Sequence, residues 1–171
     1  MEGYTQIYTG NGKGKTTAAV GLALRAATAN LKIYFAQFIK STDSNVVKGL
    51  KSKFSNIHVH NFGRHKFIDF NLEDEDKKIA QDGLAEIKKA ISGGKYDLMI
   101  LDEINIALHY GLISEKQVLN ILENKPNDLE LILTGRHAPK SIIQAADLVT
   151  KMEAIKHYFN KGVTAREGIE Y

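Results

Sequence analysis

A glycine-rich segment near the start of the chain constrains the fold more than any other feature. It reads Thr-Gly-Asn-Gly-Lys-Gly-Lys-Thr-Thr over residues 9–17 and directly follows the β-branched and aromatic residues 4–8. Glycine tolerates positive φ and close backbone approach, so this spacing predicts a tight turn after a strand. Residues 15–29 are mostly apolar, which predicts a helix packed beside a sheet. The chain is therefore expected to begin with a strand, a glycine loop and a helix.

The loop resembles a phosphate-binding loop of irregular form. Gly14, Lys15 and Thr16 match the second half of the pattern G-x-x-x-x-G-K-[ST], but Thr9 stands where the leading glycine belongs and Gly10 comes one residue late. We still expect the loop N–H groups to converge on an anion, assisted by the positive end of the following helix. The nucleotide-binding candidates are Thr9, Gly10, Asn11, Gly12, Lys13, Gly14, Lys15, Thr16 and Thr17.

Strand-like and helix-like segments alternate along the rest of the chain. Several of the strand-like segments are continuously apolar, which is typical of parallel strands covered on both faces. The predicted strands are residues 4–9, 32–39, 57–61, 97–102, 129–134 and 147–152. This alternation predicts one α/β domain over residues 1–171, a P-loop (RecA-like) fold with a mostly parallel sheet of about six strands flanked by helices.

Capping residues predict where two further helices begin. Asn71 is the expected N-cap of a helix that starts in the acidic turn 73–76 and runs to Ser92. Ser114 and Gln117 have the spacing of a capping box for a later helix that ends near residues 124–126. The segments 40–56 and 62–71 are expected to be long loops.

Acidic and basic side chains follow two of the predicted strands. Asp102 and Glu103 end an apolar strand, which would bring them to the ligand-binding carboxyl edge of a parallel sheet. With the Thr16 hydroxyl they are candidate ligands for Mg²⁺, either directly or through water. The alternative is an exposed strand end with two solvated acids. Arg136, after the strand 129–134, is a further ligand candidate because its planar fork suits polar recognition.

Composition excludes several other classes of protein. The chain has 171 residues, 43% of them hydrophobic, and 23 basic against 20 acidic side chains scattered among one another. A nucleic-acid-binding surface is therefore not indicated. Cysteine is absent, which excludes disulfides and thiolate metal sites. No signal peptide and no apolar run of about 20 residues is found, so we expect a cytoplasmic protein that does not enter a membrane.

Several segments together resemble one enzyme family. They are "TGNGKGKTTAAVGLALRA", "AQFIK", "LDEINIAL", "LILTGRHAPKSIIQAADLV" and "KHYFNKGVTAREGIEY", which cover nearly the whole chain. They are similar to the P-loop ATP:cob(I)alamin (corrinoid) adenosyltransferases. The resemblance implies a homodimer that uses ATP, Mg²⁺ and a corrinoid. It also implies that ATP lies reversed, with its γ-phosphate deep in the loop and its 5′-carbon turned toward the corrinoid.

The implied reaction assigns roles to individual residues. Co(I) attacks C5′ of ATP and triphosphate leaves, so Lys13, Lys15 and Mg²⁺ would neutralise the charge that develops, with Glu103 at the metal. Arg25 matches an arginine near the nucleotide sugar; the alternative is a solvated or ion-paired helix residue.

The resemblance leaves open which aromatic residue would contact the corrinoid. Phe62, Phe67 or Phe70 would cover the lower corrinoid face, or else anchor their loop to the core. A reductase and an enzyme that uses adenosylcobalamin are the further partners implied. Two other functions stay open: a P-loop kinase or ATPase that transfers the γ-phosphate, and a nucleotide-dependent corrinoid-binding module.

Overall fold

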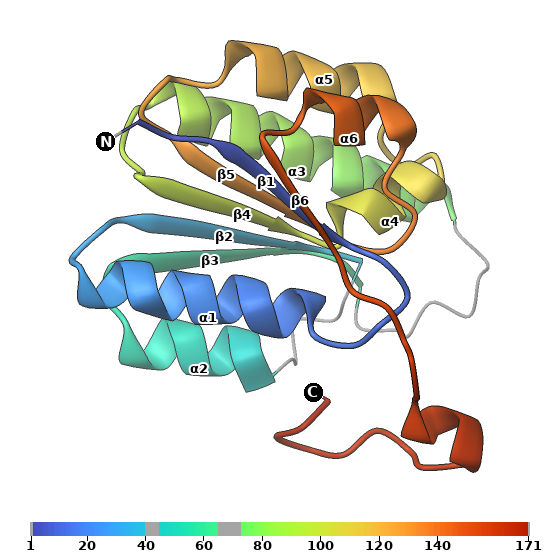
Figure 1. Cartoon of the computed structure of the whole chain (residues 1–171). Coiled ribbons are helices and arrows are strands. Elements are labelled where there is room, and N and C mark those ends of the chain that lie inside the picture. The colour runs from blue at the N-terminus through green and yellow to red at the C-terminus, as the bar shows by residue number, and fades with distance from the viewer. Residues whose placement is uncertain (1, 40–44, 65–72, 171) are drawn as a thin grey trace.

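The computed structural model describes residues 2–39, 45–64 and 73–170 of the chain. Its centre is one six-stranded sheet in which every neighbouring pair of strands is parallel (Figure 1). The strands are β1 (Thr5–Thr9), β2 (Ile33–Phe38), β3 (Ile57–Phe62), β4 (Leu98–Asp102), β5 (Glu130–Thr134) and β6 (Leu148–Lys151). The prediction of a parallel α/β sheet with about six strands is confirmed.

The strand order decides which loops meet. From one edge to the other the order is β3-β2-β4-β5-β1-β6, so β4, β5 and β1 are consecutive neighbours. All strands point the same way, and the segments that leave their carboxyl ends therefore gather at one edge of the sheet. This edge receives the glycine loop after β1, Asp102 at the end of β4 and Thr134 at the end of β5.

Helices cover both faces of the sheet (Figure 1). One face carries α1 (Lys15–Thr28) and α2 (Asn45–Lys53). The opposite face carries α3 (Asp74–Ser92), α4 (Ile104–His109), α5 (Glu115–Asn124) and α6 (Lys140–Ala145). The sheet is thus the middle layer of three, as expected for strands that are apolar on both sides.

Alternation along the strands divides the core into two layers. In β2, Tyr34, Ala36 and Phe38 pack into the layer under α3, α4 and α5, whereas Ile33 and Phe35 pack under α1 and α2. Successive strand residues point to opposite faces, so an uninterrupted apolar strand fills both layers. All six residues of β2 are buried.

The helix α1 lies close to the sheet because its inward face is made of alanine. Ala19, Ala23, Ala26 and Ala27 are buried, while Gly21 and Arg25 are exposed. Small side chains allow the helix backbone to approach the strands closely. This close packing fixes the start of α1, and hence the glycine loop, against the sheet.

Two expectations about the helices were wrong, and two short helices were not predicted. The segment 40–56, expected to be a loop, contains α2, which buries Val47 and Leu50. The N-cap of α3 is Glu73 and not Asn71, because Glu73 makes a capping box with Asp76. The short helices α4 and α6 were not expected. By contrast, the Ser114–Gln117 capping box of α5 is confirmed.

The C-terminal segment, defined here as residues 152–170, leaves the sheet after the edge strand β6 and extends beyond the sheet (Figure 1). It contains one 3₁₀ turn, η1 (Tyr158–Lys161). No helix in the described part of the chain is long and apolar enough to cross a bilayer.

Candidate active site at the carboxyl edge of the sheet

Asp102 is the centre of a buried hydrogen-bond network that joins three strands to the glycine loop. Its Oδ1 accepts hydrogen bonds from Thr16 Oγ1 at 2.9 Å and from Thr134 Oγ1 at 2.6 Å. Its Oδ2 accepts one from Gln37 Nε2 at 2.9 Å. The carboxylate is fully buried, and these donors replace the water that it loses. The network fixes the position of the Thr16 hydroxyl relative to the end of β4.

The donor set around Thr16 fits a magnesium ion that also binds phosphate. Thr16 and Asp102 supply hard oxygen atoms, and Glu103 follows directly at the N-cap of α4. Within the described residues there is no cluster of three or more histidine, cysteine or acidic side chains able to hold a metal. Mg²⁺ characteristically takes one or two protein carboxylates and completes its shell with water and substrate phosphates. The arrangement therefore suits Mg²⁺ accompanying a nucleotide.

Lys15 lies folded over the glycine loop. Its ammonium donates hydrogen bonds to the carbonyl oxygens of Gly10 at 2.8 Å and Gly12 at 2.7 Å, and the side chain is buried. Gly14 forms the N-cap of α1 with a φ of 119°, a conformation that side chains strongly disfavour. The loop thus holds a cation at the N-terminal end of a long helix, which is the electrostatic setting of an anion site.

The loop glycines have a second role that sequence reasoning missed. Met152 N donates to Thr9 O at 2.8 Å, and Gly12 N donates to Met152 O at 2.7 Å. A Cβ atom at Gly10 would lie 2.4 Å from Met152 O, and one at Gly12 would lie 2.8 Å from the Glu153 carbonyl carbon. The glycines therefore admit the backbone that follows β6 as well as bending the loop. The Gly12 N–H donates to Met152 O in this structure, and its expected role toward an anion stays a prediction.

Lys13 points to the C-terminal segment. Its Nζ donates to Tyr158 Oη at 2.9 Å and to Glu170 Oε1 at 2.8 Å. These partners lie 145 and 157 residues away along the chain. No local pattern in the sequence marks the pair.

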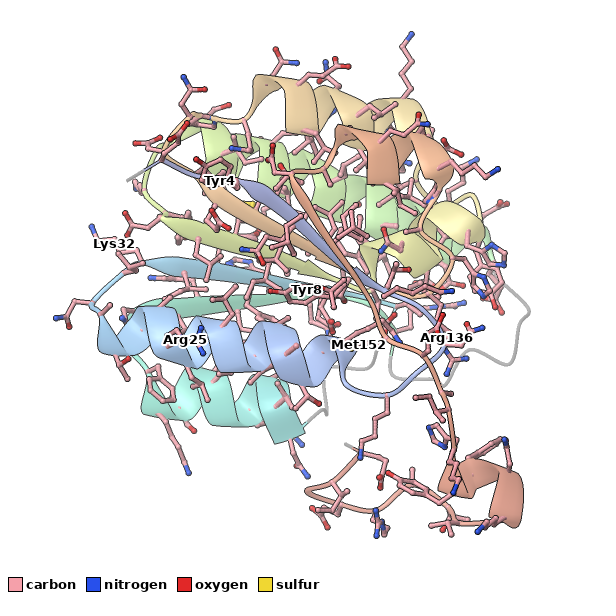
Figure 2. The ribbon with its side chains drawn as sticks, viewed as in Figure 1. Tyr4, Tyr8, Arg25, Lys32, Arg136 and Met152 are labelled. Carbon is pink, nitrogen blue, oxygen red and sulfur yellow. The ribbon has the colours of Figure 1, made fainter. Side chains whose placement is uncertain are left out.

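Arg136 and Arg25 lie in different parts of the molecule. Arg136 is exposed just after β5, at the same edge of the sheet as Met152 (Figure 2). Arg25 is exposed on α1, about 15 Å along the helix from Lys15. Its charge acts on Tyr8: burial and then Glu130 raise the pKa of the Tyr8 hydroxyl, while Arg25 opposes them. The structure does not bring Arg25 together with the loop, and its role near the sugar stays a prediction.

Phe62 is partly buried and packs against the hydrophobic core. A Cβ at Gly83 of α3 would lie 2.4 Å from Phe62 Cγ, so the ring lies against the helix backbone, and its centroid is 5.5 Å from that of Phe38. Two residues on, Arg64 donates to Asp76 at 2.7 Å and to Glu73 at 2.6 Å at the start of α3. These contacts favour the anchoring alternative for Phe62. Phe67 and Phe70 lie outside the described residues.

Backbone strain gathers at the same edge. Among the described residues, four other than glycine have positive φ, and three of them come within three residues of the end of a strand: Ile39 (68°), Glu103 (61°) and His137 (59°). Such conformations cost about 1–3 kcal/mol each and persist where the surroundings enforce them, often at functional sites. Beside His137, Gly135 approaches α4 so closely that a Cβ would lie 3.1 Å from Asn105 Cβ.

These features define an α/β protein whose fold is consistent with a P-loop domain, in which Thr16 after the glycine loop is hydrogen-bonded to Asp102 at the acidic end of β4. Comparison with protein families gives a narrower assignment. The chain belongs to the family described as ATP:corrinoid adenosyltransferase BtuR/CobO/CobP, whose model matches residues 1–171.

Individual relatives agree with the family match. The chain is 34% identical to a corrinoid adenosyltransferase of Sinorhizobium sp over 173 aligned residues, which cover 99% of this chain and 81% of the relative. It is 31% identical to corrinoid adenosyltransferases of Pseudomonas aeruginosa, over 99% of this chain and 84% of the relative, and of Escherichia coli K12, over 96% and 84%. The resemblance noted in the sequence is confirmed.

Proposed function

We propose that this protein transfers the 5′-deoxyadenosyl group of ATP to the cobalt of a reduced corrinoid and releases triphosphate. The observation that carries the proposal is the family match over residues 1–171. The local geometry supports it, because Thr16 at the start of α1 is hydrogen-bonded to Asp102 at the end of β4. A loop of this kind holds a phosphate chain, and a triphosphate is the group that leaves in this reaction.

The reaction needs charge stabilisation more than proton transfer. The cobalt electron pair of Co(I) forms the new bond to C5′, the C5′–O bond breaks, and its electron pair departs with the triphosphate. No proton leaves the nucleophile, so no general base is required. The protein lowers the barrier by stabilising the anionic leaving group with fixed positive charges.

Lys15 is the first of these charges. It now donates to two loop carbonyls, and with ATP bound its ammonium would donate to phosphate oxygens of the reversed nucleotide. The N-terminal N–H groups of α1 add partial positive charge at the same place. A γ-phosphate held deep in the loop leaves C5′ directed outward, where a corrinoid can reach it. Lys13 would add a second cation at the loop.

Thr16, Asp102 and Glu103 are the residues that would hold Mg²⁺. When bound, the ion would neutralise charge on the phosphate oxygens. The chain's own contribution is to fix Thr16 through the buried Asp102 network. Arg136, exposed at the same edge, is proposed to contact the nucleotide or a polar corrinoid substituent.

The remaining parts of the proposal concern assembly. We propose a homodimer that works beside a reductase, which supplies Co(I), and an adenosylcobalamin-using enzyme that receives the product. Phe67 or Phe70 is proposed to cover the corrinoid, since the Phe62 ring packs on Gly83.

Product analysis tests the function. Purified protein is incubated with ATP, Mg²⁺ and chemically reduced cobalamin in the dark, and the visible spectrum is followed. The proposal predicts the spectrum of an alkylated corrinoid that bleaches in light, together with an equal amount of triphosphate. ADP as the nucleotide product, with an unchanged corrinoid spectrum, would instead identify a phosphoryl-transferring enzyme.

A further inference from the structure

The C-terminal segment contacts the glycine loop at two places of different chemistry. Close to β6, the backbone of Met152 bonds to Thr9 and Gly12. Farther on, the side chains of Tyr158 and Glu170 bind Lys13. The first contact is neutral and forms between backbones, whereas the second is an ion pair between side chains. The two contacts therefore respond differently to an anionic ligand.

Glu170 is the centre of the second contact. Its Oε1 accepts hydrogen bonds from Lys13 Nζ at 2.8 Å and Arg166 Nη2 at 3.2 Å, and also from the Tyr158 hydroxyl. Its Oε2 accepts from the backbone N–H of Arg166 at 2.7 Å. We call Lys13, Tyr158, Arg166 and Glu170 the Glu170 cluster.

The Glu170 cluster is charged and partly shielded. The Glu170 side chain is only 16% exposed, against 39% for Lys13. The Tyr158 ring lies close to both cations, with its centroid 5.7 Å from Lys13 Nζ and 5.1 Å from Arg166 Cζ. Hydrogen bonds from Arg166, Lys13 and Tyr158 hold the pKa of Glu170 well below its ordinary value. Glu170 thus stays an anion at every pH at which the protein would work.

We propose that Glu170 competes with the triphosphate of ATP for Lys13, and that residues 154–170 form a strap which nucleotide binding releases from the glycine loop. The proposal rests on the proposed function insofar as ATP is the ligand of the loop. It adds that the loop is closed by a carboxylate of the same chain before the nucleotide arrives.

Electrostatic repulsion explains why Glu170 and a bound triphosphate would not occupy the loop together. Lys13 is in the loop itself, two residues before Lys15, and two of its three ammonium donors are already used by the strap. A triphosphate seated in the loop would place several negative charges close to the Glu170 carboxylate. Like charges at such range repel, and the triphosphate binds the loop through more groups than Glu170 does. The Lys13–Glu170 pair is therefore the contact that breaks.

The rest of the segment is built to allow this movement. The Met152 backbone bonds carry no net charge and would keep the strap attached at residues 152–153. Among the residues that the structure describes, one further hydrogen bond joins the strap to the α/β domain, from Asn45 Nδ2 at the start of α2 to Glu167 Oε1 at 3.0 Å. Gly162 and Gly168 have φ values of 80° and 74°, with no atom near enough to contact an added Cβ. Within the described ranges, polar contacts from Lys13 and Asn45 thus hold the strap.

Calorimetric titration tests the proposal without any corrinoid, so that no turnover occurs. ATP with Mg²⁺, inorganic tripolyphosphate and adenosine are each titrated into the full chain and into Glu170→Gln. The substitution removes the charge and keeps the shape. We expect Kd for ATP and for tripolyphosphate to fall by about 2- to 5-fold, the range of one exposed ion pair. Adenosine, which has no phosphate, should bind both proteins alike.

Glu153→Gln is the matched control. Glu153 is an acid of the same segment, but it pairs with Lys151 at 2.7 Å and not with the loop. Its substitution should leave all three affinities unchanged. Tyr158→Phe, which removes the hydroxyl between Lys13 and Glu170, should act like Glu170→Gln with a smaller effect. Amide exchange over residues 154–170 should become faster when ATP is added to the unaltered chain.

The possible outcomes distinguish failure of the strap proposal from failure of the proposed adenosyl transfer. Weaker or unchanged ATP binding by Glu170→Gln, relative to Glu153→Gln, would overturn the strap, as would slower exchange of its amides with ATP. A chain that binds neither ATP nor tripolyphosphate would overturn it too. Adenosyl transfer is scored separately by product. Failure to form an adenosylated corrinoid, with the Glu170→Gln effect intact, rejects the proposed function and leaves the strap standing.

Discussion

The hydroxyl of Thr16 donates a hydrogen bond of 2.9 Å to Oδ1 of Asp102. This bond joins the first turn of α1 to the carboxyl end of β4, through two residues that lie 86 positions apart in the sequence. Thr134, at the end of β5, donates to the same oxygen at 2.6 Å. The glycine loop is therefore held by the sheet itself, and substitutions here should affect both folding and catalysis.

Asp102→Asn should lower both stability and activity. The amide keeps the volume of the side chain but has only one oxygen, so a buried donor loses its partner. This should reduce the free energy of unfolding by about 1–3 kcal/mol, measured in urea. It should also raise the Mg²⁺ concentration needed for half-maximal activity. Asp97→Asn, just before the amino end of the same strand, is the control and should leave the Mg²⁺ titration unchanged. An equal shift in both variants would remove Asp102 from the metal site.

Lys15→Ala should reduce the rate of adenosyl transfer by roughly 10²–10³-fold, the effect of removing one preorganised charge-stabilising group. Single-turnover measurement of corrinoid alkylation at saturating ATP would show this. Lys32→Ala is the control, since Lys32 is exposed at the opposite edge of the sheet from Met152 (Figure 2). Near-normal alkylation by Lys15→Ala would show that the loop cation is not part of the chemistry.

Gly10→Ala and Gly21→Ala should have opposite effects on stability. At Gly10, with φ 96°, an added Cβ would lie 2.4 Å from Met152 O, so the backbone after β6 must move. We expect a loss of more than about 1 kcal/mol, because alanine is strained at positive φ in addition to the clash. Gly21 on α1 has nothing within 4 Å, and alanine should stabilise by about 0.5–1 kcal/mol. Urea denaturation distinguishes the two; a neutral Gly10→Ala would mean that the segment does not pack against the loop.

Stability should fall on acidification partly because of His137. Burial, the stacked His109 ring at 4.2 Å and Arg136 lower the pKa of His137 below its ordinary 6.5. The unfolded chain therefore binds the proton more readily, and this contribution to stability is present above about pH 6.5 and is lost as pH falls below it. His137→Asn, since asparagine tolerates positive φ, should reduce the pH dependence. An NMR titration midpoint at or above 6.5 would contradict this explanation.

The sequence predicted the sheet well because its strands are apolar on both faces. Runs such as residues 98–101 can be recognised as strands without knowing which strands pair with them. The helices that were missed lack such signals. Gly49 and the polar residues Lys48, Lys51, Ser52 and Lys53 weaken the apolar pattern of α2. The helices α4 and α6 have six residues each, too few to show a helical period.

The site was predictable where it follows from the topology of a parallel sheet. Asp102 and the glycine loop must meet at the carboxyl edge, and Thr134 could have been found by the same rule, because it also ends an apolar strand. The contacts of Lys13 with Glu170 and of Gly12 with Met152 could not be found this way. They join distant segments through single side chains or backbone atoms, and such contacts leave no periodic pattern.

Doubly labelled ATP tests the central claim most directly. ATP carrying one isotope in adenosine and another in the γ-phosphate is incubated with the protein, Mg²⁺ and reduced cobalamin, and the products are separated. The account predicts that the adenosine label moves into the corrinoid in a one-to-one ratio with triphosphate, which keeps the γ-phosphate label. Recovery of the adenosine label in ADP, with the γ-phosphate label in free phosphate or another acceptor, would contradict it.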